Sequence, residues 1–176
     1  MAKNKILNFF LKNKINKFLL VFINYSIWLI LIYISFVLIK LDTNIFLKIF
    51  IVILVGELVE RFLKNKFYRP RPIFKDGFKM HPGLIKNLYC TGSFPSGHTL
   101  KSTLFFLFIL QYQIINPLIY LSIIVPLLAF RVAVGLHYPI DIIGGIIIAS
   151  AVWLISIPVV SPPFLNNFVS FFINLI

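Results

Sequence analysis

The sequence has little charge, very few acidic residues and almost no cysteine. Only 12% of its 176 residues are charged and 60% are apolar, whereas a soluble domain has about a quarter of its residues charged. This composition excludes a disordered chain and an ordinary soluble globule. Because Cys90 is the single cysteine, no disulfide can form within the chain, and a disulfide scaffold is excluded as well.

The charge that is present is strongly one-sided. Seventeen Lys and Arg face five Asp and Glu, which gives a formal net charge of +12 and a pI near 10.0. Such a balance also occurs in nucleic-acid-binding proteins, but a mean hydropathy of +0.96 and 20 Phe argue against a nucleic-acid partner. We expect one domain, residues 1–176, embedded in the lipid bilayer.

Five segments are apolar and long enough to form an all-α bundle of membrane helices. A spanning helix needs about 20 apolar residues. The first segment lacks a cleavage site and is longer than the apolar part of a secretory signal, so we expect it to be retained. The predicted spans are residues 18–39, 45–63, 97–115, 117–134 and 142–160.

Three further segments lie outside these spans. Residues 1–17 contain five lysines and place their apolar side chains at helical spacing, which predicts an amphipathic helix on the membrane surface. The connection 64–95 is rich in Pro, Gly and Lys, and a loop of this length inside a compact protein is usually functional. The apolar tail 164–176 is interpreted as an interfacial helix, with a partial sixth span as the alternative.

Ionisable residues close to membrane spans are functional candidates, and this sequence has three clusters of them. The first, residues 64–72, follows the second span. The second, residues 94–99, opens the third span, and the third, residues 131–141, connects the fourth span to the fifth. Because successive spans alternate in direction, all three clusters are predicted on the same side of the membrane, where they can form a single site.

The residue types in these clusters suit a phosphate group. Lys64, Arg71 and Arg131 are cations, and the planar fork of arginine matches phosphate oxygens. Ser96 and Gly97 open a predicted helix, where free backbone N–H groups and the helix dipole favour an anion. The sequence therefore predicts a phosphate cradle built from protein groups.

His137 and Asp141 are four residues apart. If the fifth helix already begins there, both lie on one helix face and the carboxylate can orient the imidazole. An oriented neutral histidine can attack phosphorus, and His98 can protonate the leaving oxygen. The alternatives are a metal pair or a structural hydrogen bond for His137 and Asp141, and a helix cap for His98.

The three clusters resemble the signature of the type 2 phosphatidic acid phosphatase family, which reads Lys-x6-Arg-Pro, Pro-Ser-Gly-His and Ser-Arg-x5-His-x3-Asp. The first two motifs are complete, at residues 64–72 and 95–98. The third occupies residues 131–141 and departs from the family only at Phe130, which stands where the family has serine. This departure affects a minor hydroxyl contact and not the reaction.

The resemblance implies a role for each matching residue. His137 resembles the family nucleophile that forms a phosphohistidine, Asp141 its orienting carboxylate and His98 the acid that protonates the leaving group. The family uses no metal or other cofactor, so none is expected here. The resemblance also implies a phosphate-binding set, consisting of Lys64, Arg71, Ser96, Gly97 and Arg131.

The expected substrate is a phosphate monoester or diphosphate on a membrane lipid, because the site lies near headgroup depth. The motif residues bind the phosphate that all family substrates share, so they do not select the lipid. We favour lipid A 1-phosphate or undecaprenyl diphosphate, with phosphatidylglycerol phosphate as a further candidate. Lys75, Lys79 and Lys101 are candidate headgroup contacts, and Lys101 could equally snorkel to the surface.

Two other functions fit part of the sequence. One is a general phosphatidic acid phosphatase. The other is a non-enzymatic protein that binds or transports anionic lipids, which would not need His137 and Asp141 together. A vanadium-dependent haloperoxidase shares a related cradle, but those enzymes are soluble and lack five apolar spans.

The composition, rich in Lys, Asn, Ile and Phe, favours a bacterial inner membrane protein, and the resemblance favours a site that faces the periplasm. The positive-inside rule predicts the opposite orientation, because residues 1–17 and 64–86 are rich in lysine.

On the second predicted span, Glu57 precedes Arg61 and Glu60 precedes Lys64 by four residues each, so these acids are expected to be charge partners.

Overall fold

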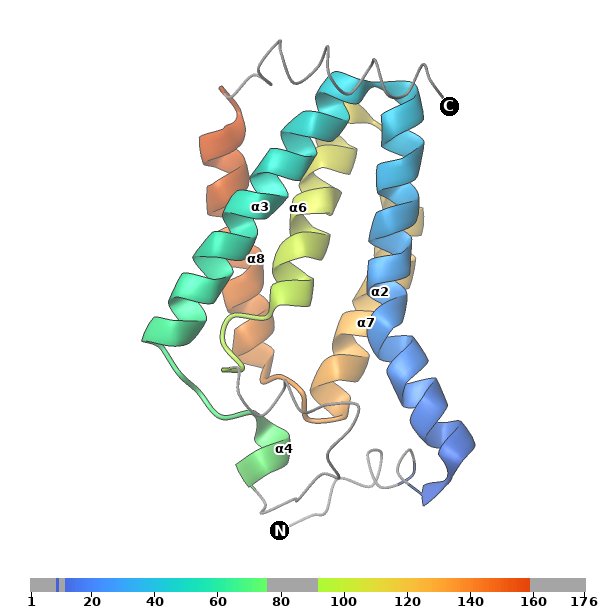
Figure 1. Ribbon diagram of the computed structural model, residues 1–176, viewed down its shortest axis with the longest axis vertical. Coiled ribbons are helices and arrows are strands. Elements are labelled where there is room, and N and C mark those ends of the chain that lie inside the picture. Colours follow the sequence, from blue (N-terminus) through green and yellow to red (C-terminus); the bar gives the residue numbers. More distant parts are fainter. Residues whose placement is uncertain (1–8, 10–11, 76–91, 159–176) are drawn as a thin grey trace.

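The computed structural model describes residue 9 and residues 12–75 and 92–158. This part of the chain is all-helical, as the sequence predicts, and it contains no strand. Five long helices run along one common axis, with the short α4 at one end (Figure 1). Their bounds are α2 (Lys14–Leu41), α3 (Thr43–Lys66), α4 (Pro72–Lys75), α6 (Gly97–Tyr112), α7 (Pro117–Ala133) and α8 (Pro139–Ser156).

Side-chain caps set the short connections of the bundle. The carboxylate of Asp42 accepts hydrogen bonds from the backbone of Asn44 and Ile45, so α3 begins directly after α2 ends. The side chain of Asn116 caps α7 in the same way, and Pro117 follows it at the first helical position. These tight turns make consecutive helices antiparallel neighbours.

The helix α6 lies at the centre and packs against α2, α3, α7 and α8, most extensively against α8. Gly145 allows this close approach, because a Cβ at this position would lie 2.9 Å from both the Ser96 carbonyl oxygen and the Thr99 Cβ. Four of the fully buried side chains of the core lie on α6, namely Leu100, Leu104, Phe108 and Ile109.

The outer faces of the other four long helices are apolar. Phe18 on α2, Leu118 on α7 and Ile155 on α8 are each more than 70% exposed. Soluble monomers rarely expose apolar patches of this extent, whereas lipid tails cover them without cost. Two helical segments, Phe18–Lys40 and Pro139–Ser156, are long and apolar enough to cross a membrane. Together with this surface they indicate membrane association, and the count of five spans stays a prediction.

Several predicted boundaries need correction. The third predicted span ends early, because Gln113 adopts a left-handed conformation with φ of 51° and terminates α6. The predicted loop 64–95 begins too early, because α3 continues to Lys66. The tail 164–176 lies outside the described residues, as does most of the predicted surface helix 1–17, whose last residues already belong to α2.

The ends of the helices bring the three motif clusters together. The helices α3 and α7 end, and α6 and α8 begin, at the lower end of the bundle in Figure 1. The N-terminal end of α2 lies at the same end. The arrangement predicted from alternating spans is therefore present, and the bundle end that holds the clusters is called the motif end below.

Candidate active site

The backbone ties the three motif clusters to one another. The first cluster bonds to the segment before α6, the residue that follows this cluster bonds to the turn after α7, and the start of α6 bonds to the start of α8. This network fixes the relative positions of groups that are far apart in the sequence. The three hydrogen bonds run from Ser93 N to Arg69 O (2.8 Å), from Ile73 N to Gly135 O (3.0 Å) and from Ser96 N to Asp141 O (3.0 Å).

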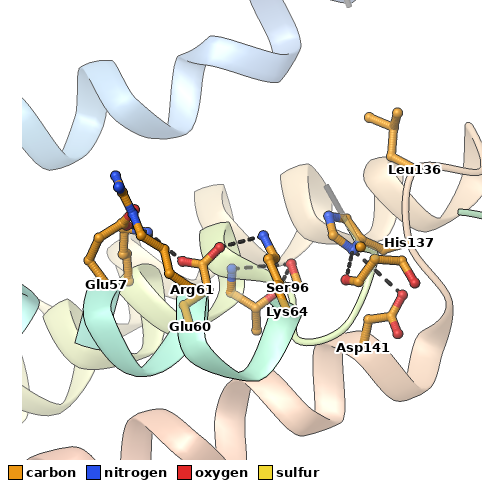
Figure 2. A network of polar contacts seen from close by, with 12 residues as sticks. Glu57, Glu60, Arg61, Lys64, Ser96, Leu136, His137 and Asp141 are labelled. Atoms are coloured by element: carbon orange, nitrogen blue, oxygen red, sulfur yellow. Dashed lines mark hydrogen bonds and ion pairs between the residues drawn. The ribbon is translucent and has the colours of Figure 1, made fainter. Parts of the chain in front are cut away.

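His137 lies in the turn between α7 and α8 and is only 2% exposed. Its Nδ1 is 3.0 Å from the carbonyl oxygen of Ser93 and 3.6 Å from Oδ2 of Asp141 (Figure 2). Both partners are acceptors, so the hydrogen-bond network assigns the ring proton to Nδ1. The other nitrogen, Nε2, lies 3.2 Å from Nη1 of Arg71, which can only donate. Nε2 therefore carries the lone pair.

Burial also sets the charge of this ring. Removal from water lowers the pKa of His137 from 6.5 to about 4, and the hydrogen bond to Asp141 opposes this shift only in part. The imidazole is therefore neutral at pH 7, and its Nε2 is available as a nucleophile.

The relation of His137 to Asp141 differs from the expected one. They do not share a helix face, because α8 begins at Pro139, whose fixed φ and missing N–H suit a first helical position. Asp141 accepts a hydrogen bond from the backbone N–H of Tyr138 at 2.8 Å and caps α8 while it faces His137. The Ser93 carbonyl oxygen lies closer to Nδ1 of His137 than the Asp141 carboxylate does. The sequence does not predict this contact, because every residue has a backbone carbonyl whatever its type.

Arg71 is buried against the same turn. Its Nη1 donates to the carbonyl oxygen of Leu136 at 2.9 Å, and its Nη2 lies 3.5 Å from the carbonyl oxygen of Gly92. Burial lowers the pKa of Arg71 to about 10, so the guanidinium is still a cation at pH 7. A fixed positive charge thus lies directly beside the lone pair of His137.

Arg131 lies in the last turn of α7 and is buried. Its Nη1 donates to both the side-chain oxygen and the backbone carbonyl of Asn24 on α2. Its Nε makes no hydrogen bond within the part of the chain that the structure describes. Asn24 therefore holds the Nη1 atom of this guanidinium, while the buried Nε–H can donate to a further acceptor.

The second motif forms the start of α6. The hydroxyl of Ser96 caps the helix by accepting from the backbone and side chain of Thr99, the latter at 2.9 Å. A Cβ at Gly97 would overlap the carboxylate of Glu60, so a larger residue there would displace this carboxylate from its ion pairs with Lys64 and Lys101. His98 packs edge-on against Trp28 of α2, and its Nε2 makes no hydrogen bond among the described residues.

Lys64 belongs to a chain of ion pairs on α3 and α6. Glu60 binds Lys64 at 2.5 Å and Lys101 at 2.7 Å, and Lys101 reaches Glu57 at 2.5 Å. Glu57 in turn binds Arg61 at 2.7 Å, so both expected pairs of opposite charge are present (Figure 2). Lys101 is 5% exposed and held by these ion pairs, so it does not snorkel to the surface. The predicted headgroup contact of Lys101 stays a prediction.

The side chains of the other two predicted headgroup contacts, Lys75 and Lys79, lie outside what the structure describes. Lys75 is the last residue of α4 and its side chain is not described, and Lys79 lies outside the described residues. Arg69, which the sequence analysis did not single out, stacks 3.9 Å over the ring of Tyr138 and lies 3.6 Å from Oδ1 of Asp141. The sequence does contain a feature that points to Arg69, because Arg69-Pro70 repeats the Arg-Pro pair of the motif two residues before Arg71.

The described residues contain no group of three or more His, Cys, Asp or Glu that could hold a metal ion.

The model of the PAP2 superfamily matches residues 45–163, which is more than half of the chain and includes all three motifs. The chain belongs to the PAP2 superfamily. Members of this superfamily are phosphatases, which supports a phosphatase-type activity for this PAP2 protein. No curated protein and no solved structure matches the chain.

Replacing Lys101 with Met tests the buried ion-pair chain of this PAP2 protein. The substitution leaves the carboxylates of Glu57 and Glu60 without their shared cation, and a buried pair that loses one partner costs about 3 kcal/mol. Thermal unfolding in detergent should show this loss. The control is Lys48→Met, which among the described residues removes one hydrogen bond, to the Ile157 carbonyl. Equal stability of the two variants would contradict the ion-pair account. Adding Glu57→Gln to Lys101→Met should restore part of the loss, because Glu60 keeps Lys64 as its partner.

The low pKa of His137 predicts how stability depends on pH. Its pKa is about 4 in the folded protein against 6.5 ordinarily, so between these values the unfolded chain binds the additional proton. Stability should therefore fall as the pH is lowered from 6.5 to 4, by about 3 kcal/mol from this residue. The measurement is the unfolding midpoint of the wild type and of His137→Gln across this range. Equal pH dependence of the two proteins would show that His137 titrates normally.

Proposed function

We propose that this protein hydrolyses a phosphate monoester or diphosphate on a membrane lipid through a phosphohistidine at His137, without a metal or other cofactor. The observation that carries the proposal is the pairing of His137 Nε2, a neutral nitrogen with a lone pair, with the buried guanidinium of Arg71 at 3.2 Å. Membership of the PAP2 superfamily supports the phosphatase chemistry. The apolar outer faces of the bundle support a lipid as the substrate.

Phosphate binding uses donors that the fold already orients. When a phosphate oxygen accepts from Arg71 in place of His137, the phosphorus comes to face Nε2. The buried Nε of Arg131 supplies a second donor. Lys64 donates a hydrogen bond to Glu60 with one of its three N–H groups and has others that can donate to the substrate. The first turn of α6, at Ser96 and Gly97, adds the positive end of its dipole.

The reaction then takes two displacements. Nε2 of His137 forms a bond to phosphorus while the bond to the leaving oxygen breaks, and His98, protonated once the negatively charged phosphate is bound beside it, gives its proton to that oxygen. The Ser93 carbonyl and the Asp141 carboxylate hold the Nδ1 proton as the ring becomes positive. Water then attacks phosphorus, His98 takes a proton from it, and the bond between Nε2 and phosphorus breaks to release phosphate.

We favour lipid A 1-phosphate or undecaprenyl diphosphate as the substrate and keep phosphatidylglycerol phosphate as a further candidate. Arg69 supports a strongly anionic headgroup, because its side chain is 41% exposed at the motif end beside Asp141. We also propose a location in the bacterial inner membrane with the site facing the periplasm, which rests on family expectation. The general phosphatidic acid phosphatase is the alternative.

The direct test is phosphate release by the detergent-solubilised protein in the presence of EDTA. The panel holds lipid A, undecaprenyl diphosphate, phosphatidylglycerol phosphate and phosphatidic acid. We expect release that resists EDTA and falls at least 1,000-fold in His137→Ala, because loss of a covalent nucleophile removes the main reaction route. His81→Ala is the matched control, since His81 is the one histidine outside the motifs.

The outcomes separate the candidate functions. The ranking of the four lipids decides between an envelope-lipid phosphatase and a general phosphatidic acid phosphatase. Binding of the lipids by folded protein without any release would favour the non-enzymatic lipid-binding protein. Equal rates for His137→Ala and wild type would rule out a phosphohistidine at this residue.

A further inference from the structure

The helix α2 lies outside the family match, which begins at residue 45, yet it reaches two motif residues. Asn24 and Trp28 are four residues apart and so lie one turn apart on the same face of α2. Asn24 contacts Arg131 of the third motif, and Trp28 contacts His98 of the second. A helix that served only as a membrane anchor would not need polar and aromatic contacts with both motifs.

Asn24 holds one edge of the Arg131 guanidinium. Its side-chain oxygen and its backbone carbonyl both accept from the same Nη1 atom. Because the guanidinium is planar, fixing Nη1 restricts the plane of the whole group. The Nε of Arg131, buried and without a hydrogen bond within the described residues, is then presented in one orientation to an incoming oxygen.

Trp28 restricts the ring of His98 by packing. The two rings meet edge to face, with centroids 5.4 Å apart and planes at 69°. The ammonium of Lys101 lies 5.4 Å from the same indole, and Glu57 and Glu60 fix that ammonium. Since His98 Nε2 has no hydrogen bond among the described groups, this packing is what limits its rotation.

We propose that Asn24 and Trp28 are positioning residues of the phosphatase reaction. Asn24 aligns Arg131 to bind the substrate phosphate, and Trp28 aligns His98 for proton transfer to the leaving oxygen. The proposal rests on the proposed function and extends it to α2. It makes this helix a functional part of the active site and not only a membrane anchor.

The test for Trp28 uses two substrates that differ in their leaving group. Dioctanoyl phosphatidic acid releases an alcohol, which needs a proton, whereas p-nitrophenyl phosphate releases a stable phenolate, which does not. Trp28→Ala should lower kcat about 100-fold for the first and less than threefold for the second, as expected for impaired general-acid catalysis. Trp28→Phe keeps an aromatic edge and should recover most of the loss.

The test for Asn24 predicts a different kinetic pattern. Asn24→Ala should raise KM about tenfold for both substrates and change kcat less than threefold, because it weakens phosphate binding whatever the leaving group. Asn24→Asp should raise KM further, since a carboxylate competes with phosphate for Arg131. Leu29→Ala on the exposed face of the same helix is the control and should match the wild type.

The outcomes keep the two proposals apart. A wild type that cleaves either substrate through His137 upholds the proposed function, and the α2 variants then decide this inference alone. Equal losses of kcat on both substrates for Trp28→Ala, with no recovery in Trp28→Phe, would indicate a purely structural role and overturn it. So would wild-type kinetics in both alanine variants. If the wild type cleaves only another lipid of the panel, the α2 variants are assayed on that lipid, and a wild type that cleaves none of these substrates overturns both proposals.

Discussion

Burying a cation away from water costs several kcal/mol unless acceptors surround it, and the motif end of this bundle buries several. The cations meet this requirement in three ways. Lys64 and Lys101 are paired with glutamates, Arg71 with backbone carbonyls and Arg131 with an asparagine. The rest of the site follows from these pairings, because they decide which donors are left for a substrate and which nitrogen of His137 carries the lone pair.

Because the chain has only five acidic residues, few carboxylates are available to pair with its seventeen Lys and Arg. Of the five Asp and Glu, four lie in the described part of the chain, and each has a defined contact. Asp42 caps α3, Glu57 and Glu60 balance the buried lysines, and Asp141 caps α8 while it faces His137. The remaining positive charge of the chain is therefore not neutralised internally. A phosphate-bearing substrate would supply the missing negative charge at the motif end.

Much of the site could be predicted from the sequence, because its chemistry lies in residue types at fixed spacing. Lys64, Arg71, His98 and His137 could be grouped from their positions at helix ends, and the structure brings their segments together. The role of Ser93 could not, because its carbonyl is a backbone group. The start of α8 could have been predicted, since Pro139 at the first helical position is a known signal.

The contributions of α2 are the clearest example of what sequence alone misses. Asn24 and Trp28 stand inside a long apolar run, where a lone polar or aromatic residue gives no indication of its partner. Their contacts with Arg131 and His98 join residues that are 107 and 70 positions apart in the sequence, so they depend on how α2 packs in the fold. Lys101 illustrates the same point, because its partners lie on α3 and its position beside the second motif suggested a lipid contact.

The central claim is that His137 attacks phosphorus and carries the phosphoryl group. The most direct test is to quench the reaction with alkali, which preserves phosphohistidine, and to locate the label from a ³²P-labelled lipid by peptide mapping. The account predicts label on His137 that acid removes, that forms in the presence of EDTA and that is absent from His137→Ala. Steady turnover with the label on another residue, or activity retained in His137→Ala, would contradict it.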